Sequence, residues 1–174
     1  MKHFSLIIIA LLFSVTTFAQ HTFDTDFTQT KVMKLSGKTT NKAGHIVFDG
    51  KDQLQMNYNI PDGDSFIIDG NMVKINMDGK KAELDANKVK MVGLQRSTLL
   101  NCLSGNWEQA AIDNNAETTI TEEKGMKIVS INAKGKVPKG GYRSVTLTYR
   151  MSDNGMVKMV LEEAAGIINT YEIK

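Results

Sequence analysis

Hydrophobic and polar residues alternate one by one over residues 53–60, where Leu54, Met56, Tyr58 and Ile60 are separated by glutamine and asparagine. Because successive side chains of a strand point to opposite faces, this pattern predicts a strand with one apolar and one polar face. Asp-Gly dipeptides favour tight turns with positive φ. They occur four times in this region, at residues 49–50, 62–63, 69–70 and 78–79. The region is therefore predicted to be a meander of short antiparallel strands.

Similar alternation predicts strands elsewhere, and one change of spacing predicts a helix. We expect strands at residues 23–35, 44–48, 54–60, 66–68, 72–77, 81–84, 117–122, 126–133, 145–151, 156–161 and 167–173. The polar residues 36–42 are predicted to form a loop. Apolar residues recur at helical spacing over residues 86–103, which predicts one helix or, because Gly93 lies in its middle, two short ones. Asn87 is its expected N-cap and Gly105 follows its expected end.

The first nineteen residues are predicted to be a cleaved secretory signal peptide. Lys2 and His3 form a short basic segment, residues 4–15 are almost entirely apolar, and Thr17-Phe18-Ala19 is a small-x-small cleavage site. The apolar run has about 12 residues, whereas a membrane-spanning helix needs about 20. Residues 20–174 are therefore expected to form one soluble domain in the periplasm or outside the cell.

Composition and charge exclude several function classes. Without Lys2 the chain has 20 Lys and Arg against 19 Asp and Glu, scattered along the sequence, so no basic stripe for nucleic acid is expected. Cys102 is the single cysteine, which excludes an intramolecular disulfide, and its leucine-rich surroundings predict a buried small hydrophobe. His45 alternates with Ile46 and is expected to face solvent. No catalytic set, cofactor motif or metal-ligand spacing is visible, so no enzyme and no cofactor are predicted.

Three local motifs, in order, resemble a known family. They are Phe27-Thr28-Gln29, the strand at residues 44–48, and the acidic-Ser-apolar stretch at residues 64–71 that ends in Asp-Gly-Asn. Together with the helix that interrupts the strands midway, they make residues 24–173 similar to the LolA-type outer-membrane lipoprotein carriers. Met56 stands where that family usually has Trp, and Gly50-Lys51 stands where it has Arg-Pro.

The resemblance implies a mostly β (α+β) fold. The expected fold is an unclosed, strongly bent antiparallel β-barrel of about ten strands with a helical lid inserted mid-chain. The apolar concave face would then shelter acyl chains without covalent chemistry. The residues expected to line this cavity are Ile46, Phe48, Leu54, Met56, Tyr58, Phe66, Ile68, Val73, Ile75, Leu99, Leu100 and Leu103.

The resemblance also implies partners and a location. The partners would be an acylated lipoprotein or another lipid, an inner-membrane donor and an outer-membrane acceptor, and the protein would be a monomer in the periplasm of a Gram-negative bacterium. An alternative stays open both for the packing of the apolar residues and for the function. The apolar residues could instead fill an ordinary core beneath a permanently docked helix. The domain would then serve protein interaction or sensing in the cell envelope.

Overall fold

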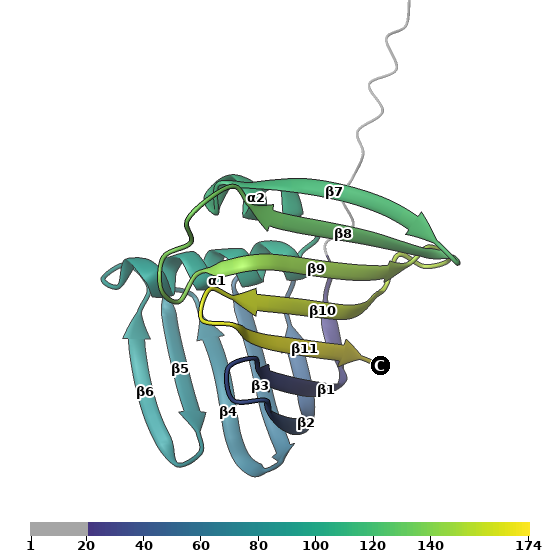
Figure 1. Ribbon diagram of the computed structural model, residues 1–174. Helices are drawn as coiled ribbons and strands as arrows, with labels where there is room; N and C mark the ends of the chain where they lie inside the picture. Colours follow the sequence, from purple (N-terminus) through teal and green to yellow (C-terminus); the bar gives the residue numbers. More distant parts are fainter. Residues whose placement is uncertain (1–20) are drawn as a thin grey trace, which may run out of the picture.

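The computed structural model describes residues 21–174, which form eleven strands and two helices (Figure 1). The predicted signal peptide lies outside the described residues. The elements are β1 (Phe23–Met33), β2 (Lys38–Phe48), β3 (Gln53–Ile60), β4 (Asp62–Asp69), β5 (Met72–Met77), β6 (Lys80–Asp85), α1 (Lys90–Leu103), α2 (Trp107–Asp113), β7 (Ala116–Glu123), β8 (Met126–Ala133), β9 (Tyr142–Arg150), β10 (Met156–Glu163) and β11 (Ile167–Ile173).

All eleven strands belong to one antiparallel sheet, in the order β6-β5-β4-β3-β2-β1-β11-β10-β9-β8-β7. Two meanders, β1–β6 and β7–β11, are joined where β1 pairs with β11. The edge strands β6 and β7 do not pair with each other, so the barrel is open. Both helices lie between these edges in sequence, and Figure 1 shows the strand direction turning strongly from β7–β11 to β3–β6. The predicted unclosed, bent antiparallel barrel with a mid-chain helical insertion is confirmed.

Two strands begin at least four residues earlier than predicted. The stretch predicted as a loop at residues 36–42 is strand from Lys38 onward, because β1 and β2 pair along eleven residues from Phe23↔Phe48 to Met33↔Lys38. Its threonines suit a strand despite their polarity. The strand predicted from Phe66 begins at Asp62, directly after the turn at Pro61.

The helical segment also differs from the prediction. α1 begins at Lys90 with Val89 as its N-cap, while the Asn87 backbone amide donates to the Asp85 side chain in a preceding turn. Gly93 does not break α1; a Cβ there would meet the Ala86 carbonyl oxygen at 2.7 Å, so glycine lets the turn before the helix approach it closely. α2 was not predicted, because seven residues are too few to show helical periodicity.

The concave face of the sheet carries the core, and the alternation in β3 explains why. Leu54, Met56 and Tyr58 are buried, as predicted, whereas Ile60 is 60% exposed. A register shift in the β2–β3 pairing, where Gly44 faces Tyr58 but Ala43 faces Ile60, takes the end of the strand out of the regular pattern. Gly44 is needed at this bulge because a Cβ would collide with the backbone of Asn57.

His45 lies on the outer face of β2, as predicted, between two carboxylates of β1. Its Nε2 lies 2.8 Å from Asp24 Oδ1 and its Nδ1 lies 3.0 Å from Asp26 Oδ1. The hydrogen bond to Asp26, followed by that to Asp24, raises the pKa of His45 above its ordinary value. The same contact lowers the pKa of Asp26. The imidazolium form thus ties β1 to β2 on the solvent side.

These shifts predict a pH-dependent contribution to stability. Because the folded-state pKa of His45 is raised, its contribution is complete below the unfolded value of about 6.5 and is lost as pH rises through the folded-state pKa. The lowered Asp26 pKa means that this carboxylate's contribution is lost only in acid, below about pH 4. We expect the excess in melting temperature of wild type over His45→Gln to be largest between these limits and to shrink as pH rises through the folded-state pKa of His45, measured by circular dichroism. The other histidines are common to both proteins and cancel; an excess that grew above pH 7 would contradict the assignment.

Candidate functional site

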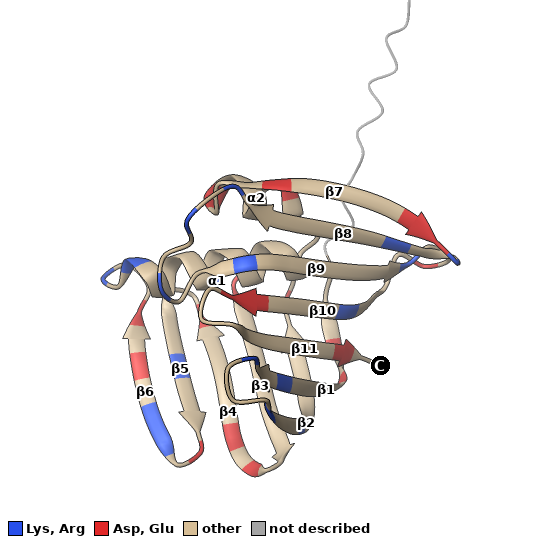
Figure 2. Ribbon diagram, in the orientation of Figure 1, with Lys and Arg blue, Asp and Glu red and all other residues tan. Residues whose placement is uncertain are grey.

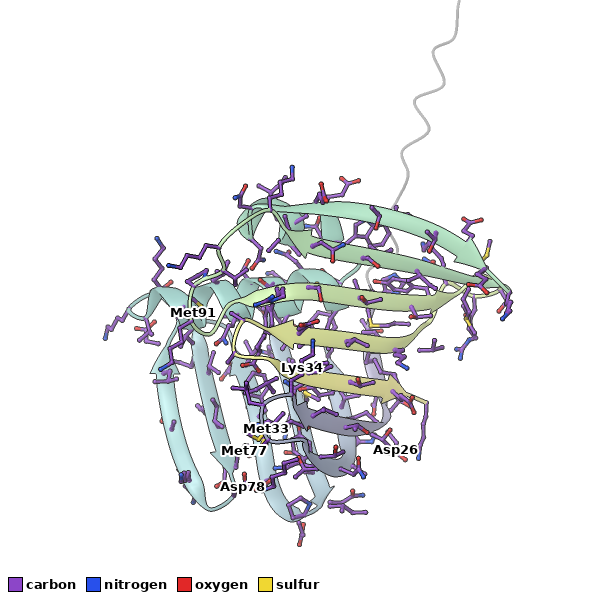
Figure 3. The ribbon with its side chains drawn as sticks, in the orientation of Figure 1. Asp26, Met33, Lys34, Met77, Asp78 and Met91 are labelled. Carbon is purple, nitrogen blue, oxygen red and sulfur yellow. The ribbon has the colours of Figure 1, made fainter. Side chains whose placement is uncertain are left out.

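A cavity of about 610 Å³ opens on the concave side of the sheet. Its walls come from both meanders, and Figure 3 shows Met33 of β1 and Met77 of β5 near its rim, with Asp78 beside Met77. A second cavity of about 160 Å³ lies against α1 and is lined by Val73, Leu84 and Val92 among others. Phe66, Ile75, Leu99 and Tyr142 line both cavities, so the two spaces adjoin.

Half of the predicted cavity residues line these two cavities. They are Met56, Tyr58, Phe66, Val73, Ile75 and Leu99. The other six are buried in the core and line neither of these two cavities: Ile46, Phe48, Leu54, Ile68, Leu100 and Leu103. One part of the concave face is therefore filled by core side chains, and another part, beneath α1, contains the two cavities.

The helix α1 covers these cavities and is docked by polar contacts as well as by its leucines. Gln95 Nε2 donates to the Gly140 carbonyl oxygen at 2.6 Å, in the loop before β9. Arg96 Nε donates to the Gly70 carbonyl oxygen at 2.6 Å, in the β4–β5 turn. The helix thus contacts both meanders across the opening between the sheet edges.

A cluster of polar side chains, which we call the interior polar cluster, interrupts the apolar wall. Its members are Tyr58, Gln29, Asn169, Tyr171 and Glu163, and all five line the larger cavity. The Tyr58 hydroxyl donates to Gln29 Oε1 at 2.9 Å, and Gln29 Nε2 donates to Asn169 Oδ1 at 3.0 Å and to the Tyr171 hydroxyl at 3.2 Å. Asn169 Nδ2 donates to Glu163 Oε1 at 3.2 Å. The cluster connects β1, β3, β10 and β11.

A buried ion pair lies beside this cluster. Lys42 Nζ lies 2.6 Å from Asp64 Oδ2, and the two side chains are 15% and 8% exposed. The same ammonium lies 3.4 Å from Asp78 Oδ1 and 5.5 Å from the centre of the Tyr58 ring. The Lys42 hydrogen bond lowers the pKa of Asp64. Burial opposes the charge on Lys42, but its bonds to Asp64 and Asp78 outweigh that effect and raise its pKa. Both groups stay ionised at neutral pH.

The tyrosines of the cavity remain neutral. Burial is the main cause that raises the pKa of Tyr58, Tyr142 and Tyr171, with a smaller contribution from neighbouring acidic groups. Their hydroxyl groups therefore act as hydrogen-bonding groups rather than as bases.

Sequence reasoning missed the polar lining of the cavity. Gln29 shares the inward parity of Phe27 in β1, and Asn169 and Tyr171 share that of Ile173 in β11, so alternation alone could have placed them inside. They were not predicted because the predicted cavity residues were chosen for their apolar side chains. Lys42 lies in the stretch that was predicted to be a loop, so its position in β2 was not predicted.

Two other reactive side chains, Cys102 and His21, lie away from the cavities. Burial raises the pKa of the Cys102 thiol to about 12, so this thiol stays protonated and packs as the predicted small hydrophobe. The ring of His21 lies 5.9 Å from that of Tyr149. Across residues 21–174, no cluster of three or more His, Cys, Asp and Glu residues could hold a metal ion. No helix in that part of the chain is long and apolar enough to cross a membrane.

The sequence comparison identifies the family. Residues 19–174 match the model of the family described as "Outer membrane lipoprotein carrier protein LolA". The chain belongs to the LolA family. Its concave cavity and docked helix are thus features of a LolA-family protein. No curated protein gave a significant match to this sequence.

The solved structures that match this fold share little sequence with this chain. A LolA superfamily protein of Nitrosomonas europaea is 8% identical, with 90% of this chain and 85% of that chain covered and a TM-score of 0.40. The lipoprotein LppX of Mycobacterium tuberculosis is 9% identical, with coverages of 87% and 85% and a TM-score of 0.33. Family membership rests on the sequence match to the family model.

The interior polar cluster generates a stability prediction. Replacing Gln29 with methionine leaves the Tyr58 hydroxyl and Asn169 Oδ1 without their partner inside the protein, which should cost about 1–3 kcal/mol of unfolding free energy. Tyr58→Phe alone should cost less, and the double variant should be less destabilised than the sum of the single variants, because they share one hydrogen bond. Urea unfolding measures these values, with Gln55→Met on the exposed outer face as the control. Independent, additive effects would contradict the cluster.

Proposed function

We propose that this protein is a periplasmic carrier that shelters the acyl chains of a lipoprotein or another lipid in the cavity beneath α1. The observation that carries the proposal is the pair of adjoining cavities of about 610 and 160 Å³ on a concave face lined by Met56, Phe66 and Leu99. Membership of a family described as lipoprotein carriers supports the same reading. The proposed role involves binding and release without covalent chemistry.

The physical need for such a carrier follows from the cost of exposing acyl chains to water. Each buried methylene group is worth about 0.8 kcal/mol, so a long chain does not cross an aqueous compartment unaided. Met56, Met33 and Met77 line the larger cavity. Methionine side chains are unbranched and adapt to irregular ligands. A lining of this kind favours binding that is strong enough for transport and loose enough for release.

In this proposal α1 is the moving part. Its contacts to Gly70 and Gly140 are made by two side chains, Arg96 and Gln95. Leu100 and Leu103 of α1 are buried in the core, while Leu99 lines both cavities. Displacement of α1 would join the two cavities and admit a longer chain.

The alternative function is an interaction domain that works through its outer surface. One observation favours it: a depression of about 430 Å³ lies over β4–β6. Its outward-pointing lining residues are Ser65, Ile67, Lys74, Asn76, Lys81 and Glu83. This depression mixes charged and apolar groups and suits a peptide better than an acyl chain.

Neighbouring residues of β4 distinguish these functions, because they point to opposite faces. Phe66 lines both interior cavities, whereas Ile67 lines the outer depression. Phe66→Gln should weaken binding of a fluorescent fatty-acid probe at least about tenfold, since a bound chain would bury an unpaired amide. Ile67→Gln should bind the probe as wild type does. Fluorescence titration measures both affinities, and thermal melts establish that both variants fold.

The opposite result would contradict the carrier function. If wild type bound no probe, or if Ile67→Gln abolished binding while Phe66→Gln retained it, the interior cavity would not be the working site.

A further inference from the structure

The charges at the rim of the cavity indicate what kind of lipid it accepts. Building on the proposed carrier function, we propose that the cargo is a single-chain amphiphile with an anionic head group. The head group would sit at the rim between Lys31 and Lys38, and the acyl chain would run inward past Met56 toward α1. The shared chemistry of the head is a carboxylate or a phosphate on one acyl chain.

Lys31 and Lys38 both line the larger cavity, on adjacent strands at the turn end of the β1–β2 hairpin. Their register positions are close: Lys31 pairs with Thr40, and Lys38 pairs with Met33. Among residues 21–174 neither ammonium group forms an ion pair or a side-chain hydrogen bond, unlike Lys34, which lies 2.7 Å from Glu162. In Figure 2 positively and negatively charged residues are mixed along the strands in view. Lys31 and Lys38 are therefore a local feature rather than part of a general basic surface.

The remaining charges of the cavity already have partners. Lys42 is paired with Asp64 and Asp78. Glu163 accepts a hydrogen bond from Asn169. The two rim lysines are therefore the cationic groups of the cavity that have no carboxylate partner among the described residues, and they favour a negative head group.

The arrangement along the cavity matches an amphiphile entering tail first. The methylene stems of lysine side chains extend an apolar wall while their ammonium groups stay at the water surface. Deeper than the rim, Met56, Phe66 and Leu99 provide the apolar lining, and the adjoining smaller space against α1 continues it. The hydrogen bonds of the interior polar cluster are satisfied within the protein, so an acyl chain that passes it leaves no broken pair behind.

The size of the cavity favours one chain over several. A methylene group occupies about as much space as a water molecule in the liquid, about 30 Å³. The larger cavity of about 610 Å³ therefore holds one chain of roughly 16 to 20 carbons. A cargo with several long chains would need far more space than this form of the protein contains.

The test compares ligands that share one tail and differ in the head. Dodecanoate, dodecyl phosphate, 1-dodecanol and dodecyltrimethylammonium, each below its micellar concentration, displace a neutral fluorescent probe from the wild-type protein. Inorganic phosphate without a chain is a further arm. We expect dodecanoate, dodecyl phosphate or both to bind at least about tenfold more tightly than the alcohol and the ammonium compound, and inorganic phosphate alone not to displace the probe.

Charge reversal locates the head group. The double variant Lys31→Glu/Lys38→Glu should no longer prefer anionic ligands to 1-dodecanol. Its affinity for the anionic ligands should fall about tenfold or more, while its affinity for 1-dodecanol should stay unchanged. Lys51→Glu/Lys139→Glu makes the same change in net charge at exposed positions outside the cavity and should bind like wild type. Melting curves establish that both double variants fold.

Failure of this inference is distinguishable from failure of the carrier function. Equal binding of all four heads, or an unchanged anion preference in Lys31→Glu/Lys38→Glu, would overturn the head-group proposal while the carrier function stood. Displacement by inorganic phosphate alone would overturn it by showing an anion site without a chain. Binding of none of the ligands would overturn both proposals.

Discussion

The pairing of β1 with β11 is the interaction on which the rest of the structure depends. It joins two meanders that are each local in sequence into one sheet, through seven residue pairs from Phe27↔Ile173 to Met33↔Ile167. Because β6 and β7 remain unpaired with each other, the sheet bends without closing. The helices α1 and α2 then cover the opening between β6 and β7. They do not fill the concave face along its whole length. The two cavities lie in the part of the concave face that is left unfilled, and none of their lining residues belongs to α2.

The interior polar cluster is placed where the two meanders meet. Gln29 of β1 reaches Tyr58 in one direction and Asn169 and Tyr171 in the other, so its hydrogen bonds cross the same junction as the β1–β11 pairing. A buried amide is costly when its partners are missing, which gives this junction a specific geometry that apolar packing alone would not. The cluster therefore fixes one wall of the cavity, while the methionines leave the rest of the lining adaptable.

Much of this architecture could be predicted from alternation and turn chemistry, because both act over a few residues. Leu54, Met56 and Tyr58 were placed on the inner face correctly, and positive φ at Gly50, Gly70 and Gly79 agrees with three of the four predicted Asp-Gly turns. The fourth was wrong, because Asp62 and Gly63 lie in β4, after the turn at Pro61. Ile60 could not be placed, because the bulge that exposes it depends on the neighbouring strand. Which apolar residues line a cavity and which fill the core depends on where α1 docks, and no local pattern records that. Leu99 and Leu100 are adjacent in sequence, yet only Leu99 lines the two interior cavities.

The central claim is that the space beneath α1 holds an acyl chain. The most direct measurement is native mass spectrometry of the protein purified without detergent, followed by solvent extraction and identification of any bound molecule. The account predicts a complex of one protein with one bound molecule, whose extracted mass corresponds to a single acyl chain carrying an anionic head. A protein that is found only at its bare mass, and that stays so after incubation with dodecanoate, would contradict it.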